Sequence, residues 1–364
     1  MRALVINDRK SARVEDVEVP VAGEGQVVVN VSRAGICGTD VELFTGQLAY
    51  FGQGKIGFPI RPGHEWCGVV SELGAGVNPA WLGARVTGDT MLGCGQCHSC
   101  RGGHPWVCAD RREVGIMGWP GALAEKVLVR ASSLFRLPDT IDDRAGALVE
   151  PGGNAWRAAT AAQAAPGKRI LVCGPGTIGL LTTAFARAAG AEVHLLALGP
   201  DREREELAAR SGAAGFWTAG DLPSLSFDAV IDCTDDHEMP AAALAWVEPA
   251  GRLVFIGIAG VPSLIDSRDI ILGDLTVVGI LGASAGLGPA IEHYASGRVD
   301  PTGLAEVTVG LEDAAQALAG QVSTGRGTKI LIDPRVRLPW RLWNRARPTA
   351  GGRHSWRPCW PPAT

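Results

Sequence analysis

The sequence predicts an α/β protein of two main domains, a β-rich barrel-like unit followed by a unit of alternating strands and helices. The chain has 364 residues, a length that suits two domains with sizeable cores. Up to about residue 137 the apolar runs are short and bounded by glycine or proline, which is typical of strands. From residue 168 strand-like and helix-like segments alternate, which predicts a doubly wound parallel sheet covered by helices on both faces.

Composition and charge limit the classes of partner. Hydrophobic residues make up 46% of the chain and charged residues 20%, as in an ordinary globular protein. The net charge is −4, but the last 31 residues hold seven arginines and no acid, so residues 1–333 carry −4 − 7 = −11. A net negative charge on residues 1–333 argues against a nucleic-acid partner. No signal-peptide pattern or long unbroken apolar stretch is present, so we expect a cytoplasmic protein without a membrane partner.

The first domain, expected over residues 1–152, shows no long helical period. Its strands are expected at residues 27–31, 68–73, 84–87, 124–129 and 134–137. An alanine-rich helix at 145–165 leads into the second domain, expected over 153–289. In that domain we expect strands at 168–173, 192–198, 228–232, 252–256 and 276–280, and helices at 177–189, 201–211 and 239–247.

The remaining chain falls into two parts. Residues 290–333 are expected to pack back on the first domain, with helices at 288–296 and 311–319 and a final strand at 329–333. Residues 334–364 hold four tryptophans, seven arginines and six prolines without periodicity. That composition predicts a disordered or non-native tail, and a basic–aromatic arm for a membrane surface or nucleic acid is the alternative. We assign this tail no role.

Four cysteines within fifteen residues predict a closed metal site. Cys94, Cys97, Cys100 and Cys108 are spaced C-x₂-C-x₂-C-x₇-C. In a cytosolic chain clustered thiols bind a metal more often than they form disulfides. Four thiolates around one Zn²⁺ form a complete tetrahedral shell, which is typical of a structural site.

A second, open metal site can be assembled from separate places. Cys37 follows a predicted strand, His64 and Glu65 are adjacent at the start of another strand, and Glu150 lies where the first domain ends. A thiolate, an imidazole and a carboxylate are acceptable zinc ligands that leave a fourth position for water or substrate. The alternatives are a buried core thiol at Cys37 and a surface charge at Glu150.

A glycine turn predicts dinucleotide binding. The run Gly174-Pro175-Gly176-Thr177-Ile178-Gly179 matches G-x-G-x-x-G, with a predicted strand before it and a predicted helix after it. The second glycine lets the backbone approach a pyrophosphate, and the helix N-terminus supplies amide donors and a favourable dipole.

Together these motifs resemble the zinc-dependent medium-chain alcohol dehydrogenases, especially the branch with sorbitol, threonine and glucose dehydrogenases. The resemblance covers about residues 1–333 and includes Gly-Ile-Cys-Gly-Thr-Asp at 35–40, Gly-His-Glu at 63–65 and Glu-Pro at 150–151. It implies a GroES-like catalytic domain, completed by the C-terminal segment, and a Rossmann domain between the two parts. It also implies one catalytic and one structural zinc per chain, NAD(P), and a homodimer or homotetramer.

The resemblance assigns roles to individual residues. It implies that Cys37 and His64 bind the catalytic zinc, and that Glu65 and Glu150 bind it directly or stand beside it. Cys94, Cys97, Cys100 and Cys108 match the structural site. Thr39 matches the hydroxyl that starts proton transfer from the alcohol, and Glu42 occupies the place of a histidine relay, with an exposed carboxylate as the alternative.

The end of the second Rossmann strand bears on the cofactor. NAD-preferring members carry an acid there, whereas this chain has Ala197 or Leu198, and Asp201 comes slightly late. Either Arg202 or Arg204 can pair with a 2′-phosphate, which favours NADP over NAD. Alternatively both arginines pair with the glutamates of their own helix.

The sequence therefore predicts a zinc-dependent NAD(P)-linked oxidoreductase that oxidises a small-molecule secondary alcohol, such as a polyol or sugar, to a ketone. Two alternatives stay open. One is an amino-alcohol dehydrogenase acting on threonine or an aminocyclitol, and the other is a non-catalytic dinucleotide-binding sensor.

Overall fold

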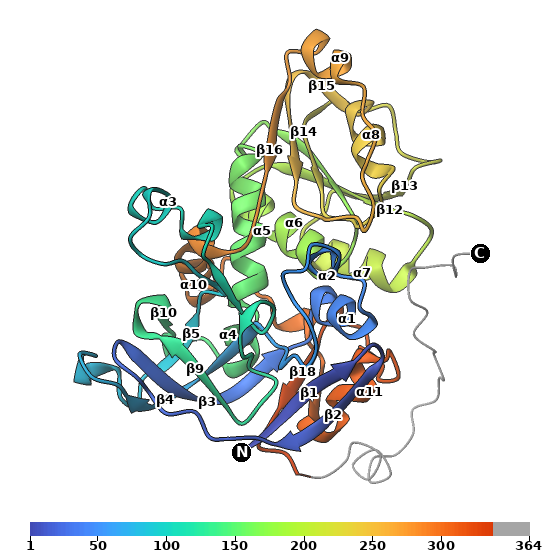
Figure 1. Ribbon diagram of the computed structural model, residues 1–364. Coiled ribbons are helices and arrows are strands. Elements are labelled where there is room, and N and C mark those ends of the chain that lie inside the picture. Colours follow the sequence, from blue (N-terminus) through green and yellow to red (C-terminus); the bar gives the residue numbers. More distant parts are fainter. Residues whose placement is uncertain (338–364) are drawn as a thin grey trace. The chain divides into compact units, whose positions relative to one another are not determined.

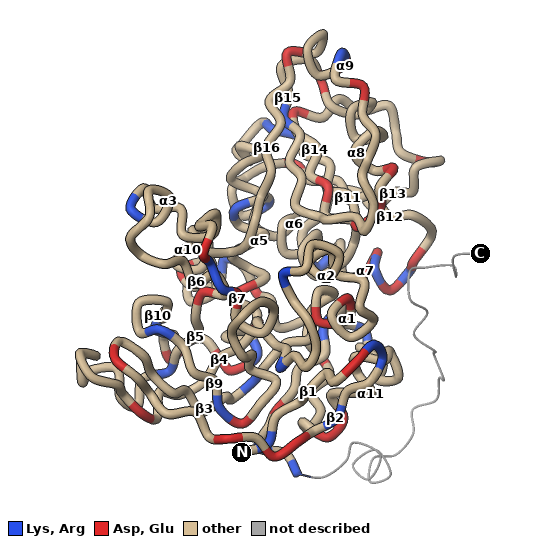
Figure 2. Tube along the Cα trace, in the orientation of Figure 1, with Lys and Arg blue, Asp and Glu red and all other residues tan. Residues whose placement is uncertain are grey.

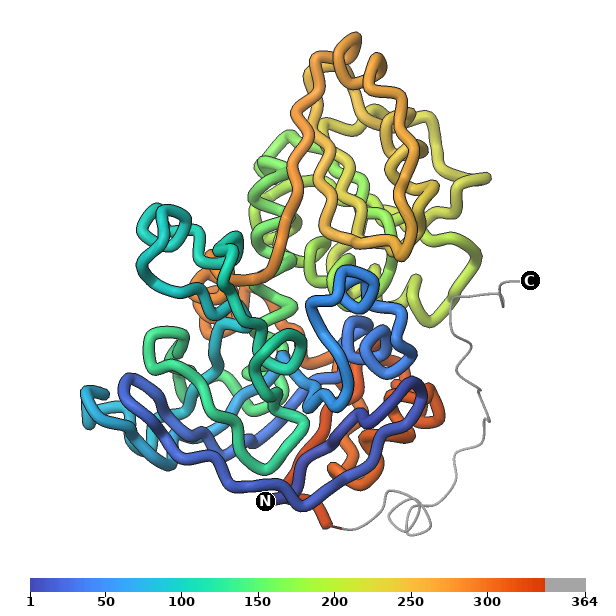
Figure 3. The backbone as a smooth tube through the Cα atoms, viewed as in Figure 1, coloured from blue at the N-terminus to red at the C-terminus, as the bar shows by residue number. Residues whose placement is uncertain are grey.

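The computed structural model describes residues 1–337, which form two compact units. The first unit comprises Met1–Glu150 and the chain from Ala305 onward, and the second comprises Pro151–Leu304. In the first unit the blue N-terminal strands and the red C-terminal segment run beside each other (Figure 3). The chain thus leaves the first unit, builds the second, and returns.

The first unit is built on mainly antiparallel sheets, in which only the described pairs β17–β18 and β7–β8 are parallel (Figure 1). Among the described residues its main sheet has seven strands in the order β10-β5-β4-β3-β18-β17, with β9 paired to β3. A hairpin of β1 (Arg2–Asp8) and β2 (Ser11–Asp16) and a small sheet of β6, β7 and β8 complete it. The other strands are β3 (Gln26–Gly35), β4 (Glu65–Leu73), β5 (Arg85–Gly88), β6 (Met91–Leu92), β7 (Arg112–Val114), β8 (Gly118–Trp119), β9 (Lys126–Arg130), β10 (Leu134–Arg136), β17 (Val307–Gly310) and β18 (Ile330–Asp333).

The core of this unit lies between the hairpin and the main sheet. Leu4 and Ile6 of β1 pack in one buried cluster with Val27 and Val29 of β3 and Trp66 of β4. β-Branched residues fit the pleated surface of such strands. The helices of the unit are short: α1 (Gly38–Thr45), α2 (Ala49–Gly52), α3 (His98–Arg101), α4 (Asp143–Ala147) and α11 (Ala314–Leu318).

The second unit is a doubly wound parallel sheet. Its six described strands follow the order β13-β12-β11-β14-β15-β16, and every neighbouring pair is parallel. In chain order this is 3-2-1-4-5-6, the Rossmann arrangement. The strands are β11 (Arg169–Cys173), β12 (Glu192–Ala197), β13 (Gly215–Thr218), β14 (Phe227–Asp232), β15 (Val247–Phe255) and β16 (Thr276–Gly279), and the helices are α5 (Val149–Ala161), α6 (Thr177–Ala188), α7 (Arg202–Arg210), α8 (Met239–Leu244), α9 (Ser267–Leu272) and α10 (Leu287–Ala295).

Several predicted elements differ from the structure in extent. The helix predicted at 145–165 is two helices, because α4 ends with its cap at Leu148 and α5 starts at Val149. The hairpin β1–β2 and the strands β13 and β17 lie outside the sequence prediction. Residue 290, where the return to the first domain was expected, lies in α10 of the second unit, where Tyr294 stacks on Phe185.

The tail predicted for 334–364 lies outside the described residues from 338 onward. At its described start Arg335 pairs with Asp333 and Asp143 of the first unit. No helix in residues 1–337 is long and apolar enough to cross a membrane. Basic and acidic residues are interspersed along both units (Figure 2).

Candidate functional site

The open metal site forms where β3 and β4 pair. In their antiparallel register Gly35 stands opposite Glu65. The chain leaves β3 through Cys37, so the thiol arrives beside His64 and Glu65 at the start of β4. One ligand atom from each of Cys37, His64 and Glu65 lies within 4.8 Å of the others. One ion with bonds of about 2.0–2.3 Å can reach all three atoms.

Asp40 holds the two ligand-bearing loops together. Its carboxylate is fully buried and accepts hydrogen bonds from the backbone N–H of Cys37 at 2.9 Å and of Gly63 at 3.1 Å. The same carboxylate lies 3.6 Å from Nδ1 of His64. Burial opposes a charge on His64, but the negative charges of Asp40 and Cys37 outweigh it and hold the pKa of His64 well above its usual value. Asp40 and Cys37 thus favour positive charge at His64.

Lys329 is a member of this site that the sequence prediction missed. Strand β18 pairs with β3, with Leu331 opposite Gly35, and this brings Lys329 to Glu65. The Lys329 Nζ donates to Glu65 Oε1 at 2.7 Å, and both side chains are buried. Burial lowers the pKa of Lys329, but the charge of Glu65 outweighs it, so the pKa of Lys329 is raised and the lysine stays charged.

The polar atoms left at this site fit a metal ion. Oε2 of Glu65 and Nδ1 of His64 are buried and have no hydrogen-bond partner in the described structure. Nδ1 of His64 faces the Asp40 carboxylate, whereas Oε2 of Glu65 has no such contact. Buried polar atoms are nearly always paired, so this oxygen beside a thiol and an imidazole indicates a place for a bound cation. Thiolate, imidazole and carboxylate donors together suit Zn²⁺.

The other predicted residues of this site lie on two helices. Thr39 and Glu42 are half-buried on α1, three residues apart and hence on one face of the helix. The thiol of Cys37 lies 3.9 Å from the hydroxyl of Thr39. Glu150 is buried near the start of α5. Within residues 1–337 the group of mutually close ligand atoms does not include Glu150.

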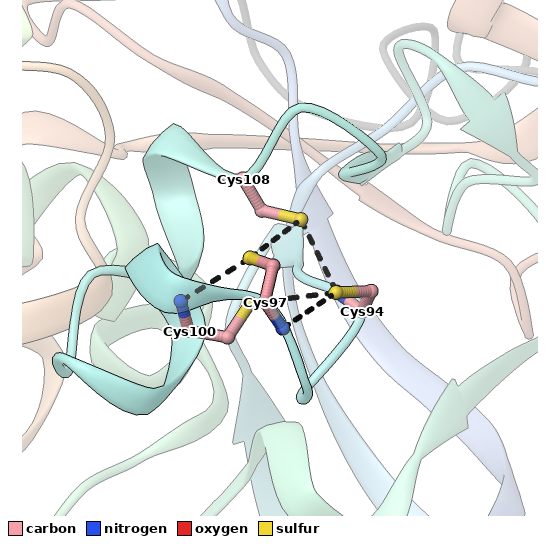
Figure 4. Close-up of side chains that lie close together, drawn as sticks. All are labelled: Cys94, Cys97, Cys100 and Cys108. Carbon is pink, nitrogen blue, oxygen red and sulfur yellow. Dashed lines mark hydrogen bonds between the residues drawn. The ribbon is translucent and has the colours of Figure 1, made fainter.

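The four cysteines of residues 94–108, a segment that we call the lobe, come together as a second group of possible metal ligands (Figure 4). The Cys94 and Cys100 sulfurs lie 4.0 Å apart and those of Cys97 and Cys108 lie 3.7 Å apart. Backbone N–H groups of Cys97 and Cys100 donate to the sulfurs of Cys94 and Cys97, each at 3.4 Å. Four sulfurs at these separations match a closed tetrahedral site for one Zn²⁺.

The thiols of the lobe have different proton affinities. Hydrogen bonds from the backbone of Gln96 and Cys97 lower the pKa of Cys94 to about 6. Burial raises the pKa of Cys100 to about 11. A bound cation would favour the thiolate at every position.

The glycine turn joins β11 to α6 as the sequence predicts. Gly174 has φ of +95°, a backbone conformation that side chains disfavour. A Cβ at Gly179 would overlap the carbonyl oxygen of Gly174, so this glycine lets the helix pack on the turn. A Cβ at Gly176, by contrast, would meet nothing within 4 Å. Gly176, Thr177 and Ile178 thus open α6 with room for a phosphate at its N-terminus.

No acid stands at the end of β12. The strand ends at Ala197, which is buried. Asp201 caps α7 and accepts a hydrogen bond from the backbone of Arg204 at 3.0 Å. Arg202 begins α7 and is exposed.

Comparison with known proteins shows the family. Residues 23–139 match the family described as alcohol dehydrogenase GroES-like domain, and residues 177–295 match zinc-binding dehydrogenase. An L-threonine 3-dehydrogenase of Anaeromyxobacter dehalogenans is 31% identical over 294 residues, which cover 78% of this chain and 84% of that protein. The chain belongs to the zinc-dependent medium-chain alcohol dehydrogenase family.

Solved structures are similar over nearly their whole length. A protein from Escherichia coli CFT073, described as a short chain alcohol dehydrogenase complexed with NADH, has a TM-score of 0.84 at 25% identity, with 92% of this chain and 99% of that chain covered. A protein from Sinorhizobium meliloti 1021, described as a zinc-binding dehydrogenase bound to NADP, has a TM-score of 0.83 at 29% identity, with the same coverage of 92% and 99%.

These findings confirm the predicted fold and class of enzyme. The first unit is a GroES-like domain, and the second is a Rossmann domain. The protein is an oxidoreductase, an alcohol dehydrogenase that depends on Zn²⁺ and NAD(P) and acts on a small molecule. The comparisons therefore favour the enzyme over the non-catalytic sensor.

Proposed function

We propose that this enzyme oxidises a secondary alcohol with polar neighbours to a ketone at the site formed by Cys37, His64 and Glu65. The observation that carries the proposal is that ligand atoms of these three residues lie within 4.8 Å of one another, while a buried oxygen of Glu65 has no hydrogen-bond partner. When bound, zinc would polarise the alcohol oxygen and lower its pKa, and the nicotinamide would accept the hydride. The alcohol loses one proton and one hydride, and the products are the ketone, NAD(P)H and a proton.

The protein's own residues would position the metal and remove the proton. Cys37, His64 and Glu65 hold the ion, Asp40 fixes the loops that carry the first two, and Lys329 neutralises one oxygen of Glu65. The hydroxyl of Thr39 takes the alcohol proton and passes it along α1 to Glu42, which releases it to solvent. Glu150 stands near the start of α5 as a further candidate ligand or water-mediated partner.

The lobe and the glycine turn would have separate tasks. Cys94, Cys97, Cys100 and Cys108 hold a structural zinc, which gives the catalytic domain a fixed lobe without taking part in the reaction. The turn at 174–179, with Thr177 and Ile178 at the start of α6, binds the pyrophosphate of the cofactor. The missing acid at the end of β12 and the exposed Arg202 support a preference for NADP.

Two substrate classes have support. A zinc shell that contains a carboxylate favours polyols, sugars and related alcohols, which is the main proposal. The amino alcohol L-threonine is the second candidate, because the relative from Anaeromyxobacter dehalogenans is an L-threonine 3-dehydrogenase.

We also propose a cytoplasmic homodimer or homotetramer. Thiol ligands in two clusters suit a reducing compartment, because an oxidising one would convert them to disulfides. Strand β16 is an edge of the second-unit sheet, and apolar side chains are exposed on it and near it. Such an edge suits pairing with a second copy of the chain.

The test combines a substrate screen with metal analysis. Polyols, sugars, L-threonine and simple alcohols are assayed with NAD and with NADP, and zinc per chain is measured by mass spectrometry. Cys37→Ser and His64→Ala should each lose one zinc and nearly all activity. Cys67→Ala is the matched control, because Cys67 is a buried thiol of β4 outside both metal groups.

The outcomes separate the parts of the proposal. Unchanged zinc content and rates in both ligand variants would refute the catalytic site. Turnover of L-threonine alone would replace the polyol assignment by the amino-alcohol one. A strong preference for NAD would refute the role of Arg202, and Arg202→Gln should otherwise raise KM for NADP about tenfold while leaving that for NAD unchanged.

A further inference from the structure

A cavity lies in the Rossmann domain, remote from the glycine turn along α6. It has a volume of about 550 Å³ and is bounded by α6, α7 and residues 298–304, which follow α10. This volume falls within the range of small-molecule sites. Its lining includes Leu181, Leu207 and Val299, which are almost fully buried and form a fixed apolar floor.

Three arginines from three elements line the same cavity. Arg187 is in the last turn of α6, Arg210 ends α7, and Arg298 follows α10. Within residues 1–337 the guanidinium groups of Arg187 and Arg210 have no hydrogen bond or ion pair. That of Arg298 donates one hydrogen bond, to the Ser296 hydroxyl at 3.1 Å.

Asp300 is the acid in the lining, and its charge offsets one of the three arginines. One of its carboxylate oxygens accepts hydrogen bonds from the backbone N–H and the hydroxyl of Thr302 at 2.9 and 2.6 Å. Two other exposed bases of this unit are paired, Lys168 with Asp228 and Arg268 with Asp266. Three arginines and one acid therefore leave the lining with a net positive charge.

Helix dipoles account for part of this arrangement. A base in the last turn of a helix stabilises its C-terminal dipole by about 0.3–1 kcal/mol, which explains a base at Arg187 and at Arg210 taken singly. The dipole does not explain Arg298, which lies beyond α10, or the convergence of all three on one cavity with an apolar floor.

We propose that this cavity binds an organic phosphate, with the phosphate at Arg187, Arg210 and Arg298 and the organic part over the apolar floor. Guanidinium groups bind phosphate oxygens in pairs and stay charged at every physiological pH. The site is separate from the pyrophosphate site, because Arg187 lies ten residues after Thr177, about 15 Å along the helix axis. The assignment does not depend on which alcohol the enzyme oxidises.

The test uses phenyl phosphate as the probe and the full-length enzyme saturated with NADP and, separately, with NAD. Saturation fills the dinucleotide site, so calorimetry then reports the second site. We expect one phenyl phosphate per chain, and binding at least tenfold weaker in the double variant Arg210→Gln/Arg298→Gln. Arg187→Gln should also weaken binding, whereas Arg268→Gln, which removes an exposed arginine of α9, should not.

Three results would overturn the proposal. One is that titration with phenyl phosphate gives no more heat than titration with sodium chloride at the same ionic strength. Another is equal affinity in the double variant and in Arg268→Gln, which would place the probe elsewhere, for example at the metal. Equal binding of benzoate would refute the assignment to phosphate, and binding of inorganic phosphate as tight as phenyl phosphate would refute the role of the apolar floor.

Discussion

At the scale of single residues, the ion pair between Lys329 and Glu65 is the feature of the site that most constrains its chemistry. The pair fixes one oxygen of Glu65, and the other oxygen is buried without a hydrogen-bond partner. A buried pair costs desolvation, but removing one partner leaves a lone buried charge, which is worse. Lys329 thus offsets the cost of burying the Glu65 carboxylate and also fixes its orientation.

We predict that Lys329→Met destabilises the zinc-free protein by about 3–5 kcal/mol, because it leaves Glu65 buried without a counter-charge. The double variant Lys329→Met/Glu65→Gln should recover much of this loss. Urea unfolding after dialysis against a chelator measures both. If the double variant is as unstable as the single one, the effect is lost packing and not lost charge.

The same pair predicts a pH dependence of stability. The pKa of Lys329 is raised above its ordinary value of 10.5. Its contribution is therefore fully present below about pH 10.5 and is lost as the pH rises through the higher folded-state pKa. The difference in unfolding free energy between wild type and Lys329→Met/Glu65→Gln, in which no lone carboxylate titrates, should be constant from pH 6 to 9 and shrink at higher pH. A difference that shrinks between pH 6 and 9 would contradict this.

A proton-transfer role for Thr39 gives a second prediction. Thr39→Val keeps the shape of the side chain and removes the hydroxyl, so kcat should fall about 10²–10⁴-fold with zinc content unchanged. Thr45→Val is the control on the same helix, because the Thr45 hydroxyl donates to the backbone carbonyl of Val41 at 2.9 Å. A change in KM alone would instead mean that Thr39 only binds the substrate.

At the scale of elements, strand pairing assembles the open site. The β3–β4 register brings Cys37 to His64 and Glu65, and β18 then adds Lys329 from the far end of the chain. Each ligand stands at the end of a strand, where the backbone is fixed by ladder hydrogen bonds. The site therefore depends on elements that are distant in sequence and adjacent in the sheet.

Strand pairing also explains what the sequence could predict. The ligand types, the cysteine lobe and the glycine turn were visible because each lies within a few consecutive residues. Asp40 stood inside a recognised motif, but its hydrogen bond to Gly63 depends on the fold. Lys329 is 264 residues from Glu65, and no local pattern marks such a partner. The arginine cavity likewise joins three separate elements.

The lobe of residues 94–108 should behave as an independent metal-dependent element. We predict that Cys97→Ala lowers the zinc content from about two ions to about one per chain. Only three thiolates then remain at the structural site, and its tetrahedral shell is incomplete. Limited proteolysis should then cut within the lobe. Cys37→Ser is the control, and it should lose the other ion while the lobe stays protected. Loss of both ions in Cys97→Ala would show that the two sites fold together.

At the scale of the whole molecule, the second-unit sheet has an edge that the described chain leaves open. Strand β16 pairs with β15 on one side, and no described strand pairs on its other side. Val277 on β16 is 40% exposed, Leu272 at the end of α9 is 84% exposed, and Leu264 is 87% exposed. Exposed apolar groups next to an open edge are an aggregation hazard unless a partner covers them.

A second copy of the chain can pair with the open edge of β16 in a symmetric dimer. Two β16 strands related by a two-fold axis pair antiparallel, so one surface is complementary to itself. We predict that wild-type enzyme sediments as a dimer or tetramer and that Val277→Lys shifts it toward smaller species, because the charge would be buried at the interface. Val19→Lys is the control, since Val19 is an exposed apolar residue of the first unit. A wild-type monomer, or a Val277→Lys variant that keeps the wild-type mass, would mean that β16 is not the contact between copies.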